Sequence, residues 1–469
     1  MKKPHLCGFF FAFLFSFFTI KTMELIDSFF AEFVNYAWGW QTALLLLGAG
    51  VYFSIKTELK PFRYLGYAFE VLQGKHPSKD EVGEVSHFRA LTASLSGTIG
   101  LGNIAGVAVA IQLGGPGAIF WMWVTAVFGI ATKFFTATLS VLYREQGPDG
   151  KPNAGTMYII KNGLPKYMLP LAYFFAFFGI IAGLPAFQAN QVVQLTNDLY
   201  FPEVENFVYY AGAFLVIITA AVVLGGLKRI ANVSALLVPL MGGLYLVAVL
   251  VAVILNYQMF FPALGLIVIE AFSFDSAVAG GLVGVILTGI KRGAFSNEAG
   301  IGTEALIHGA AKTSHPVKQG LIAMTGPIFD TLIMCTLTAV IILISGVYQT
   351  SDSSGVTLTS EAFLATLGPI GPIILFVCVI SFGLSTIFTY SYYGSACSKF
   401  LFGEKSVKIY QYIFIVFVFI FSITSLDLAL NVIDSAFAMM AIPTLIASIW
   451  LAPKVIEQSD KYFSSIKKQ

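Results

Sequence analysis

The feature that most constrains this 469-residue chain is a series of apolar blocks, each about 20 residues long. A helix of about 20 residues rises about 30 Å, which is the thickness of the hydrocarbon core of a bilayer. Hydrophobic residues make up 57% of the chain and charged residues only 11%, too few to cover the surface of a soluble protein. We therefore predict an all-α integral membrane protein.

Windows of about 19 residues predict eleven transmembrane helices in this sequence. Glycine and polar residues interrupt the second and the seventh of these apolar segments. The predicted spans cover residues 36–56, 90–112, 117–143, 167–196, 207–227, 232–256, 276–311, 319–347, 371–398, 409–425 and 432–452.

The basic residues predict how the chain is oriented. Lys and Arg gather in every second connection, beginning with residues 57–89 and ending with the tail after residue 453. The alternate connections contain neither Lys nor Arg, and several carry acids such as Asp198 and Glu270. By the positive-inside rule, the first main span starts outside a cell (inner) membrane and the C-terminus is cytoplasmic.

The first 22 residues resemble a signal sequence. Lys2 and Lys3 precede an apolar run from Cys7 to Ile20 that is short for a span, and no typical cleavage site follows it. Met23 could equally be the true start of the protein. The two interpretations of this segment stay open at this point.

Two similar stretches indicate an internal repeat. Asn103–Ala108 in the second segment and Asn297–Gly302 in the seventh both read Asn-x-Ala-Gly, then a β-branched residue, then a small one. They lie five spans apart, and because five is odd, the two units enter the membrane from opposite sides. The sequence therefore predicts an inverted repeat.

The same segments contain the glycine-dense runs Ser96–Asn103 and Gly293–Gly300, which predict breaks in both helices. Non-helical backbone at mid-membrane is tolerated around a buried polar cavity, so paired breaks indicate a transport site. Close packing of small residues is the alternative, but it requires neither Asn103 nor the Ser-Asn-Glu triplet that begins at Ser296.

A site of this kind suits an amino acid. The N-terminal ends of half-helices present free N–H groups and a positive dipole to a carboxylate. Unwound carbonyl groups can receive an ammonium group or a sodium ion. A zwitterion supplies both charges, whereas nothing in the sequence resembles a catalytic triad, a phosphate-binding loop or a metal cluster.

Charged residues inside the predicted spans need a reason, because each costs at least about 2.5 kcal/mol at mid-membrane. For Lys291 and Arg292 we predict a structural ion pair with Glu298, Asp330 or Asp434, in preference to substrate contact, and a role in gating is the alternative. Glu298 lies within the second predicted break and could brace it, couple to the ion or take part in gating. The full set is Lys133, Lys291, Arg292, Glu298, Glu304, Asp330 and Asp434.

Neutral polar residues also fall inside predicted spans. Gln188 and Gln191 share one helix face, which indicates either a polar stripe facing a cavity or interhelical hydrogen bonding. Ser385 and Thr386 offer hydroxyl oxygens of the kind that sodium prefers, although such hydroxyls also hydrogen-bond to their own helix.

The strings GLGNIAG (100–106), FSNEAG (295–300) and SYYG (391–394), with FQANQ (187–191), resemble the alanine or glycine:cation symporters, also called the sodium:alanine symporter family. The resemblance covers both repeats. It implies a leucine-transporter-like fold of two inverted five-helix repeats plus one peripheral helix, about eleven transmembrane helices in all. It also implies import of alanine or glycine with Na+ as the co-transported ion, by alternating access.

Site residues follow from the resemblance. It implies that sodium lies near Thr98, Ile99, Ser385 and Thr386. It implies substrate contact with Thr98, Gly100, Gly102, Asn103, Gln188, Phe295, Ser296, Asn297, Gly300 and Tyr390. Two positions depart from the family's usual pattern: Tyr390 replaces a Trp, and Thr136 replaces a Glu three residues after Lys133. The first change leaves the substrate range open, and the second leaves the partner of Lys133 open.

The sequence thus predicts a symporter rather than an enzyme, with a small neutral amino acid and the lipid bilayer as partners and with no organic cofactor, nucleic acid or obligate protein partner. A proton-coupled transporter is the nearest alternative, because Glu298 could titrate, and an ion channel is the next. The predicted parts are residues 1–22 as a signal-like or non-native extension, 23–88 as a peripheral transmembrane helix and cytoplasmic linker, 89–256 as the first five-helix repeat, 257–275 as an external connection, 276–452 as the second five-helix inverted repeat and 453–469 as a cytoplasmic tail.

Overall fold

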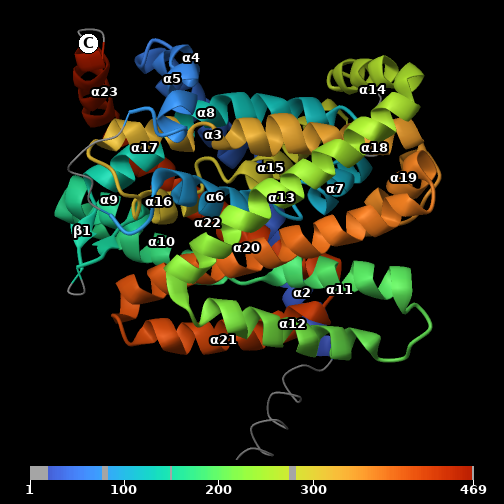
Figure 1. Cartoon of the computed structure of the whole chain (residues 1–469). Coiled ribbons are helices and arrows are strands. Elements are labelled where there is room, and N and C mark those ends of the chain that lie inside the picture. The colour runs from blue at the N-terminus through green and yellow to red at the C-terminus, as the bar shows by residue number, and fades with distance from the viewer. Residues whose placement is uncertain (1–19, 77–82, 148–149, 274–280, 467–469) are drawn as a thin grey trace, which may run out of the picture.

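The computed structural model describes residues 20–76, 83–147, 150–273 and 281–466, and it is almost entirely helical. The long helices lie side by side and run across the view of Figure 1. The C-terminal helix α23 lies at the same end of the bundle as α9 and β1, whereas α14 and α19 lie at the opposite end.

The first half of the described chain contains α2 (Ile20–Ala37), α3 (Trp40–Lys56), α4 (Lys60–Arg63), α5 (Leu65–Leu72), α6 (His87–Thr98), α7 (Ala105–Gly114), α8 (Ala118–Leu142), β1 (Glu145–Gln146), β2 (Pro152–Asn153), α9 (Thr156–Gly163), η1 (Lys166–Met168), α10 (Leu169–Ala182), α11 (Ala186–Tyr200), α12 (Phe207–Val223), α13 (Gly226–Leu255) and α14 (Tyr257–Glu270). The second half contains α15 (Leu282–Asn297), α16 (Thr303–His308), α17 (Pro316–Ala323), the π-helix η3 (Ile328–Cys335), α18 (Thr336–Ser345), η4 (Val347–Gln349), α19 (Val356–Leu367), α20 (Ile370–Phe402), α21 (Ser406–Ser422), α22 (Leu426–Trp450) and α23 (Ala452–Ile466).

Six helical stretches in the described residues are long and apolar enough to cross a membrane. They are Ala118–Leu142, Lys166–Tyr200, Gly226–Leu255, Pro316–Ser345, Ile370–Phe402 and Leu426–Trp450. Large apolar side chains on the outside of the bundle, such as Leu236, Leu240 and Ile254 on α13, are exposed where lipid would cover them. The multi-pass membrane architecture is therefore confirmed, while the number of eleven spans stays a prediction.

Both predicted helix breaks are present. The second span is divided between α6, which ends at Thr98, and α7, which begins at Ala105. The seventh is divided between α15, which ends at Asn297, and α16, which begins at Thr303. Each part is too short to cross the membrane alone, which is why neither appears among the six long helices.

An asparagine side chain holds each break open. In the first, Asn103 Oδ1 accepts a hydrogen bond from the backbone N–H of Gly100 at 2.8 Å. In the second, Asn297 Oδ1 accepts one from the N–H of Ala299 at 2.9 Å. These local bonds satisfy backbone groups that have left the helix, so they stabilise the breaks inside an apolar surrounding.

Some predicted connections contain helices of their own. The external connection 257–275 includes the apolar helix α14, and the linker after the first span includes α4 and α5. Helix α2 precedes the first predicted span and packs against α22. Of the signal-like segment, only residues 20–22 fall within the described part of the chain, where they begin α2.

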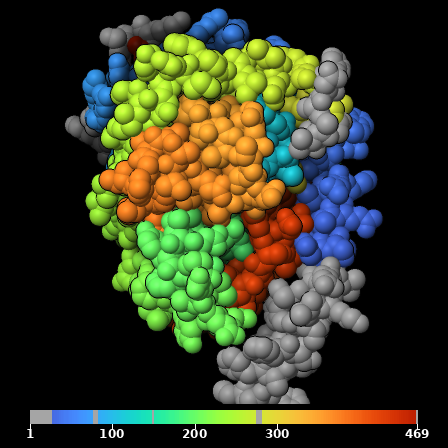
Figure 2. Space-filling view, turned by 90° about the vertical axis from the view of Figure 1, so that its right-hand side faces the viewer, coloured from blue at the N-terminus to red at the C-terminus, as the bar shows by residue number. Residues whose placement is uncertain are grey.

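One end of the bundle is covered by α19. Figure 2 faces this end and shows the chain around α14, α19 and the end of α11 packed over it. Thr359 on α19 donates a hydrogen bond to the carbonyl oxygen of Ile104 at 3.3 Å, directly at the first break. The N–H of Val356 donates to Gln191 Oε1 at 2.9 Å, which ties α19 to α11 as well.

Candidate functional site

The two broken segments meet through one direct hydrogen bond. Asn103 Nδ2 in the first break lies 3.2 Å from Ser296 Oγ, at the end of α15 just before the second break. Both side chains are buried. Residues almost two hundred positions apart in the chain therefore face each other where both backbones leave the helix, as the predicted site requires.

Asp330 joins the two breaks to a third element. Its carboxylate accepts hydrogen bonds from Asn103 Nδ2 at 2.7 Å and from Ser296 Oγ at 2.8 Å. Thr331, the next residue of η3, adds a third at 2.6 Å. Asp330 is fully buried, and its place on a π-helix is typical of functional positions.

Aromatic rings form a wall beside the breaks. The Phe295 ring is edge-on to Phe187 at a centroid distance of 5.4 Å and lies 5.8 Å from Phe437. A Cβ atom at Gly102 would lie 3.3 Å from the same ring. The backbone at Gly102 therefore lies directly against the Phe295 ring. A ligand between them has little room.

Gln188 carries one of the buried polar atoms of this region that lack a hydrogen-bond partner among the described residues. Its side chain is 2% exposed, and within the described part of the chain its Oε1 has no hydrogen-bond partner. By contrast, Asn190 donates to the carbonyl oxygen of Thr424 at 2.6 Å and Gln191 binds Val356. Of the three amides in residues 188–191, only that of Gln188 has an oxygen without a partner in the described part of the chain.

The predicted sodium ligands lie at the contact between α20 and the end of α6. Thr386 Oγ1 lies against the first break, because a Cβ atom added to Gly100 would come within 2.3 Å of it. The same hydroxyl lies 2.9 Å from the carbonyl oxygen of Ser96. Thr98 and Ile99 adjoin this contact at the end of α6. Ser385 Oγ donates to the Phe382 carbonyl oxygen of its own helix, which Thr386 Oγ1 also contacts, and it lies 3.8 Å from Met241 Sδ.

Glu298 and Asn297 brace the second break. Glu298 adopts a left-handed backbone conformation with φ 55°, and its carboxylate accepts hydrogen bonds from Tyr390 at 2.8 Å and from Thr303. Asn297 donates to Thr331 Oγ1 at 3.2 Å. Gly300 has φ 87°, and an added Cβ atom would meet Leu46 and Leu445. Its surroundings are therefore packed side chains.

Lys291 and Arg292 share a partner on α22. Lys291 Nζ lies 3.0 Å from Asp434 Oδ2, and Arg292 forms an ion pair with the same oxygen. The backbone carbonyl of Asp434 accepts a hydrogen bond from Trp38 at 2.7 Å. The predicted structural ion pair is therefore present, and of the three acids considered, Asp434 supplies it.

The structure shows what Tyr390 and Thr136, the two residues that depart from the expected pattern, contact. Tyr390 reaches Glu298 with its hydroxyl. Thr136 donates to Glu304 Oε1 at 2.6 Å. An acid from α16 thus occupies the surroundings of Thr136 on α8, near the buried Lys133.

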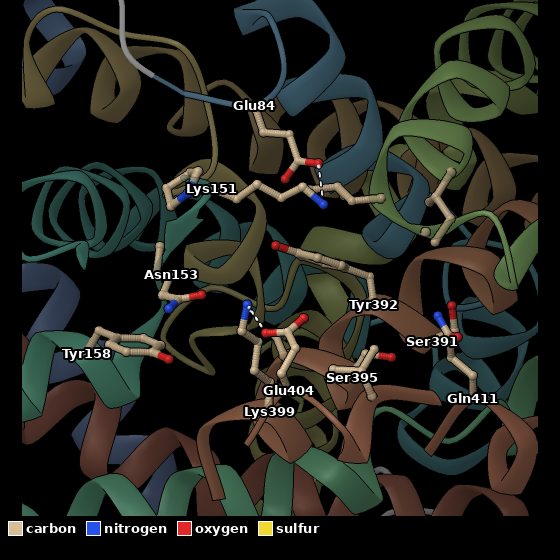
Figure 3. A pocket seen from close by; sticks show the side chains of 17 residues that line it. Glu84, Lys151, Asn153, Tyr158, Ser391, Tyr392, Ser395, Lys399, Glu404 and Gln411 are labelled. Carbon is tan, nitrogen blue, oxygen red and sulfur yellow. Dashed lines mark ion pairs between the residues drawn. The ribbon is translucent and has the colours of Figure 1, made fainter. Parts of the chain in front are cut away.

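A cavity of about 170 Å³ opens at the end of the bundle that contains α9 and β1. Figure 3 shows two ion pairs in it, Glu84 with Lys151 at 3.9 Å and Lys399 with Glu404 at 2.6 Å. Burial, with smaller effects from nearby acids, raises the pKa of Tyr158 to about 12, so this hydroxyl stays neutral. Ser391 and Tyr392 also line the cavity and directly follow Tyr390 in the chain.

Sequence reasoning missed several residues of this region. Asp330 was predicted only as a charge or as a partner of Lys291 and Arg292, and not as the acceptor of hydrogen bonds from Asn103 and Ser296. Phe437 gave no signal, because an aromatic residue in an apolar helix is ordinary. The run FQANQ, which contains both Phe187 and Gln188, was the one local signal that could have indicated the aromatic wall.

Comparison with known proteins gives the same assignment. The family model described as "Sodium:alanine symporter family" matches residues 23–469. The sodium/alanine symporter AgcS of Methanococcus maripaludis is 40% identical over 443 residues, covering 92% of this chain and 96% of that protein. The probable sodium/glutamine symporter GlnT of Bacillus subtilis is 33% identical over 434 residues, and the match covers 92% of this chain and 89% of that protein.

The fold has a solved counterpart. The crystal structure of MhsT in complex with L-phenylalanine matches with a TM-score of 0.51 at 15% identity, covering 80% of this chain and 98% of that chain. The matching family is one of transporters and not of enzymes. On the match of the family model to nearly the whole chain, this protein belongs to the sodium:alanine symporter family.

Proposed function

We propose that this protein imports a small neutral amino acid, alanine or glycine, together with sodium by alternating access. The observation that carries the proposal is the hydrogen bond between Asn103 and Ser296, which joins the two helix breaks. Backbone groups that have left a helix can bind a zwitterion and an ion there, as in transporters built on discontinuous helices. In this proposal the eleven spans form two inverted five-helix repeats plus one peripheral helix.

The size and polarity of the region favour a small neutral substrate. The rings of Phe187, Phe295 and Phe437 fill one side, and Gly102 approaches Phe295 without a side chain between them. The unpaired Oε1 of Gln188 is a hydrogen-bond acceptor for the ammonium group. A substrate with a charged side chain would leave that charge against aromatic carbon, which is costly.

Sodium suits the contact between Thr386 and the first break. The ion would lie among the hydroxyl of Thr386, the hydroxyl of Ser385 after a rotamer change, and carbonyl groups near Thr98 and Ile99. Hydroxyl and carbonyl oxygens are hard ligands suited to such an ion. Moving one positive charge inward across the membrane contributes about 2.3 kcal/mol per 100 mV of potential.

The proposed exit to the cytoplasm is the cavity shown in Figure 3. Its lining includes Lys151 and Lys399, which belong to the basic connections that the positive-inside rule assigns to the cytoplasmic side of a cell (inner) membrane. The opposite end is covered by α19, so a path to the outside requires α19 to move.

Uptake into proteoliposomes tests the function. Labelled alanine, glycine and serine are supplied with an inward sodium gradient, with an inward proton gradient or with neither. The proposal expects accumulation of alanine or glycine with sodium alone. Uptake that ignores sodium and follows the proton gradient would favour the proton-coupled alternative, in which Glu298 titrates. Ion flux far above carrier turnover would favour a channel.

Replacing Thr386 with alanine is expected to weaken sodium affinity about tenfold, because one hydroxyl ligand disappears beside the first break. The sodium concentration that gives half-maximal alanine uptake measures this. Thr386→Ser keeps the hydroxyl and should stay within about twofold of the unchanged protein. Unchanged sodium affinity in Thr386→Ala would remove the sodium assignment.

Replacing Gln188 with leucine is expected to raise the KM for alanine several-fold and to leave sodium affinity unaltered, because the change removes a buried acceptor aimed at the substrate. Asn190→Leu is the comparison on the same helix, where the lost bond is structural. A KM for alanine that does not respond to Gln188→Leu would place the substrate elsewhere.

A further inference from the structure

We infer that the cavity of Figure 3 binds a zwitterionic amino acid from the cytoplasmic side, at a site separate from the two helix breaks, and that this ligand holds the exit closed. The inference rests on the proposed function, because its ligand is the transported amino acid after release. The cavity measures about 170 Å³. Pockets for drug-sized molecules measure about 300–1,000 Å³, so this one suits a small ligand.

The cavity contains one largely buried charge of each sign. The Glu84 side chain is 11% exposed and that of Lys399 is 20% exposed, whereas their partners Lys151 and Glu404 are 54% and 65% exposed. An exposed partner can turn into water at little cost, so a ligand can take its place. The ammonium group of an amino acid then pairs with Glu84 and the carboxylate with Lys399, which is the charge complement of a zwitterion.

Neutral groups complete the lining. Ser395 is 6% exposed, and among the residues that the structure describes its Oγ has no hydrogen-bond partner. A buried hydroxyl without a partner is costly, and this one can donate to a carboxylate or accept from an ammonium group. In Figure 3 the Tyr392 side chain lies between the two ion pairs. Apolar side chains that suit an uncharged amino acid also line the cavity, namely Leu227, Ile230 and Val407.

A ligand between Glu84 and Lys399 joins parts of the protein that separate when the exit opens. The backbone N–H of Glu84 donates to the carbonyl oxygen of Ala310 at 2.8 Å, and the carbonyl oxygen of Val85 accepts from Lys312 at 2.7 Å. The chain before α6 is therefore tied to the chain after α16, whereas Lys399 lies on α20. Alternating access moves such parts against each other. An amino acid bound to both parts stabilises the closed exit, and by linkage opening weakens its binding.

Binding of labelled alanine to the purified full-length protein in sodium-free buffer tests the site, because in the proposed function the central site fills together with sodium. The unchanged protein is expected to bind alanine. Lys399→Met should lower the affinity at least about tenfold, since the carboxylate of the ligand loses its charged partner. Lys408→Met is the matched control, because Lys408 is exposed on α21 and lies outside the lining. It should stay within about twofold of the unchanged protein.

Competition with analogues that carry a single charge tests the class of ligand. Unlabelled glycine should displace labelled alanine in sodium-free buffer. Lactate, which has no ammonium group, and ethylamine, which has no carboxylate, should compete at least about tenfold more weakly. Competition by lactate equal to that by glycine would mean a plain anion site and would overturn the inference.

Transport measures the effect on the exit. Initial sodium-driven uptake of labelled alanine is compared between empty right-side-out vesicles and vesicles that contain unlabelled alanine without sodium. The internal alanine should slow the unchanged protein and Lys408→Met several-fold, and the ratio of the two rates should return toward one in Lys399→Met. If Lys399→Met fails to fold, Ser395→Ala provides the test, since its hydroxyl holds no other part of the described chain. This variant should weaken sodium-free binding about three- to tenfold.

Two outcomes separate this inference from the proposed function. A protein that takes up alanine with sodium but binds none without sodium would overturn the inference and leave the proposed function intact. Sodium-free binding that Lys399→Met weakens, in a protein that does not carry alanine, would keep the binding site and refute the proposed function.

Discussion

Replacing Asp434 with alanine is expected to lower the free energy of unfolding by about 3–5 kcal/mol, because it leaves a buried guanidinium without its counter-ion. Arg292 is only 3% exposed, and Asp434 Oδ2 is the acceptor for both Arg292 and Lys291. The guanidinium carbon of Arg292 lies 5.1 Å from the centroid of the Phe295 ring, so an aromatic side chain and not water adjoins it. Thermal or denaturant-induced unfolding of both proteins in detergent measures the change in the free energy of unfolding.

Two further variants separate the loss of the ion pair from a general effect on α22. Asp427 is exposed in the first turn of the same helix, and Asp427→Ala should cost less than about 1 kcal/mol, the size of a helix-dipole interaction. The double variant Arg292→Met with Asp434→Leu replaces the pair by apolar side chains and should recover most of the loss. Equal stability of Asp434→Ala and Asp427→Ala would show that the pair contributes little.

The helix breaks could be predicted because their causes are local. Glycine at high density and an Asn-x-Ala-Gly pattern act within a few residues, and the structure shows the mechanism in the bonds from Asn103 and Asn297 to nearby N–H groups. The positive φ of Gly300 and Gly302 in the second break is of the same local kind. Patterns of this sort are visible in one sequence.

The surroundings of the site could not be predicted, because they depend on which helices become neighbours. Three acids were candidates to pair with Arg292, and only the packing of the bundle selects Asp434. The π-helix that presents Asp330 depends on hydrogen bonding, to which composition gives no clue. The contact of Thr136 with Glu304 joins residues 168 positions apart. It places a carboxylate from α16 beside Thr136 on α8.

A further limit of sequence reasoning is the interpretation of connections. Hydropathy assigned residues 257–275 to an external connection, but α14 within it is an apolar helix at the end of the bundle. Helix α19 was likewise part of a connection, yet it contacts the first break through Thr359. A hydropathy window as long as a full span includes the polar residues that flank a short apolar helix, so it assigns such a helix to a connection.

Replacing Gly100 with alanine is expected to weaken sodium affinity about 10- to 100-fold and to abolish sodium-driven uptake at low sodium. The new methyl group would lie 2.3 Å from Thr386 Oγ1, far inside contact distance. Thr386 is β-branched and its hydroxyl is held between Ser96 and Phe382, so it cannot turn aside cheaply. Overpacking of this kind costs about 1–3 kcal/mol, which corresponds to that range of affinity.

Gly106 is the matched control for this change, since it lies in the same interrupted span and a Cβ atom there would meet nothing closer than 4.0 Å. Gly106→Ala should transport normally. Neither glycine has a positive φ, so backbone strain does not distinguish the two variants. Half-maximal sodium concentrations for alanine uptake, compared between Gly100→Ala and Gly106→Ala, decide the matter. Similar values in both would mean that the contact between the first break and Thr386 is not where sodium binds.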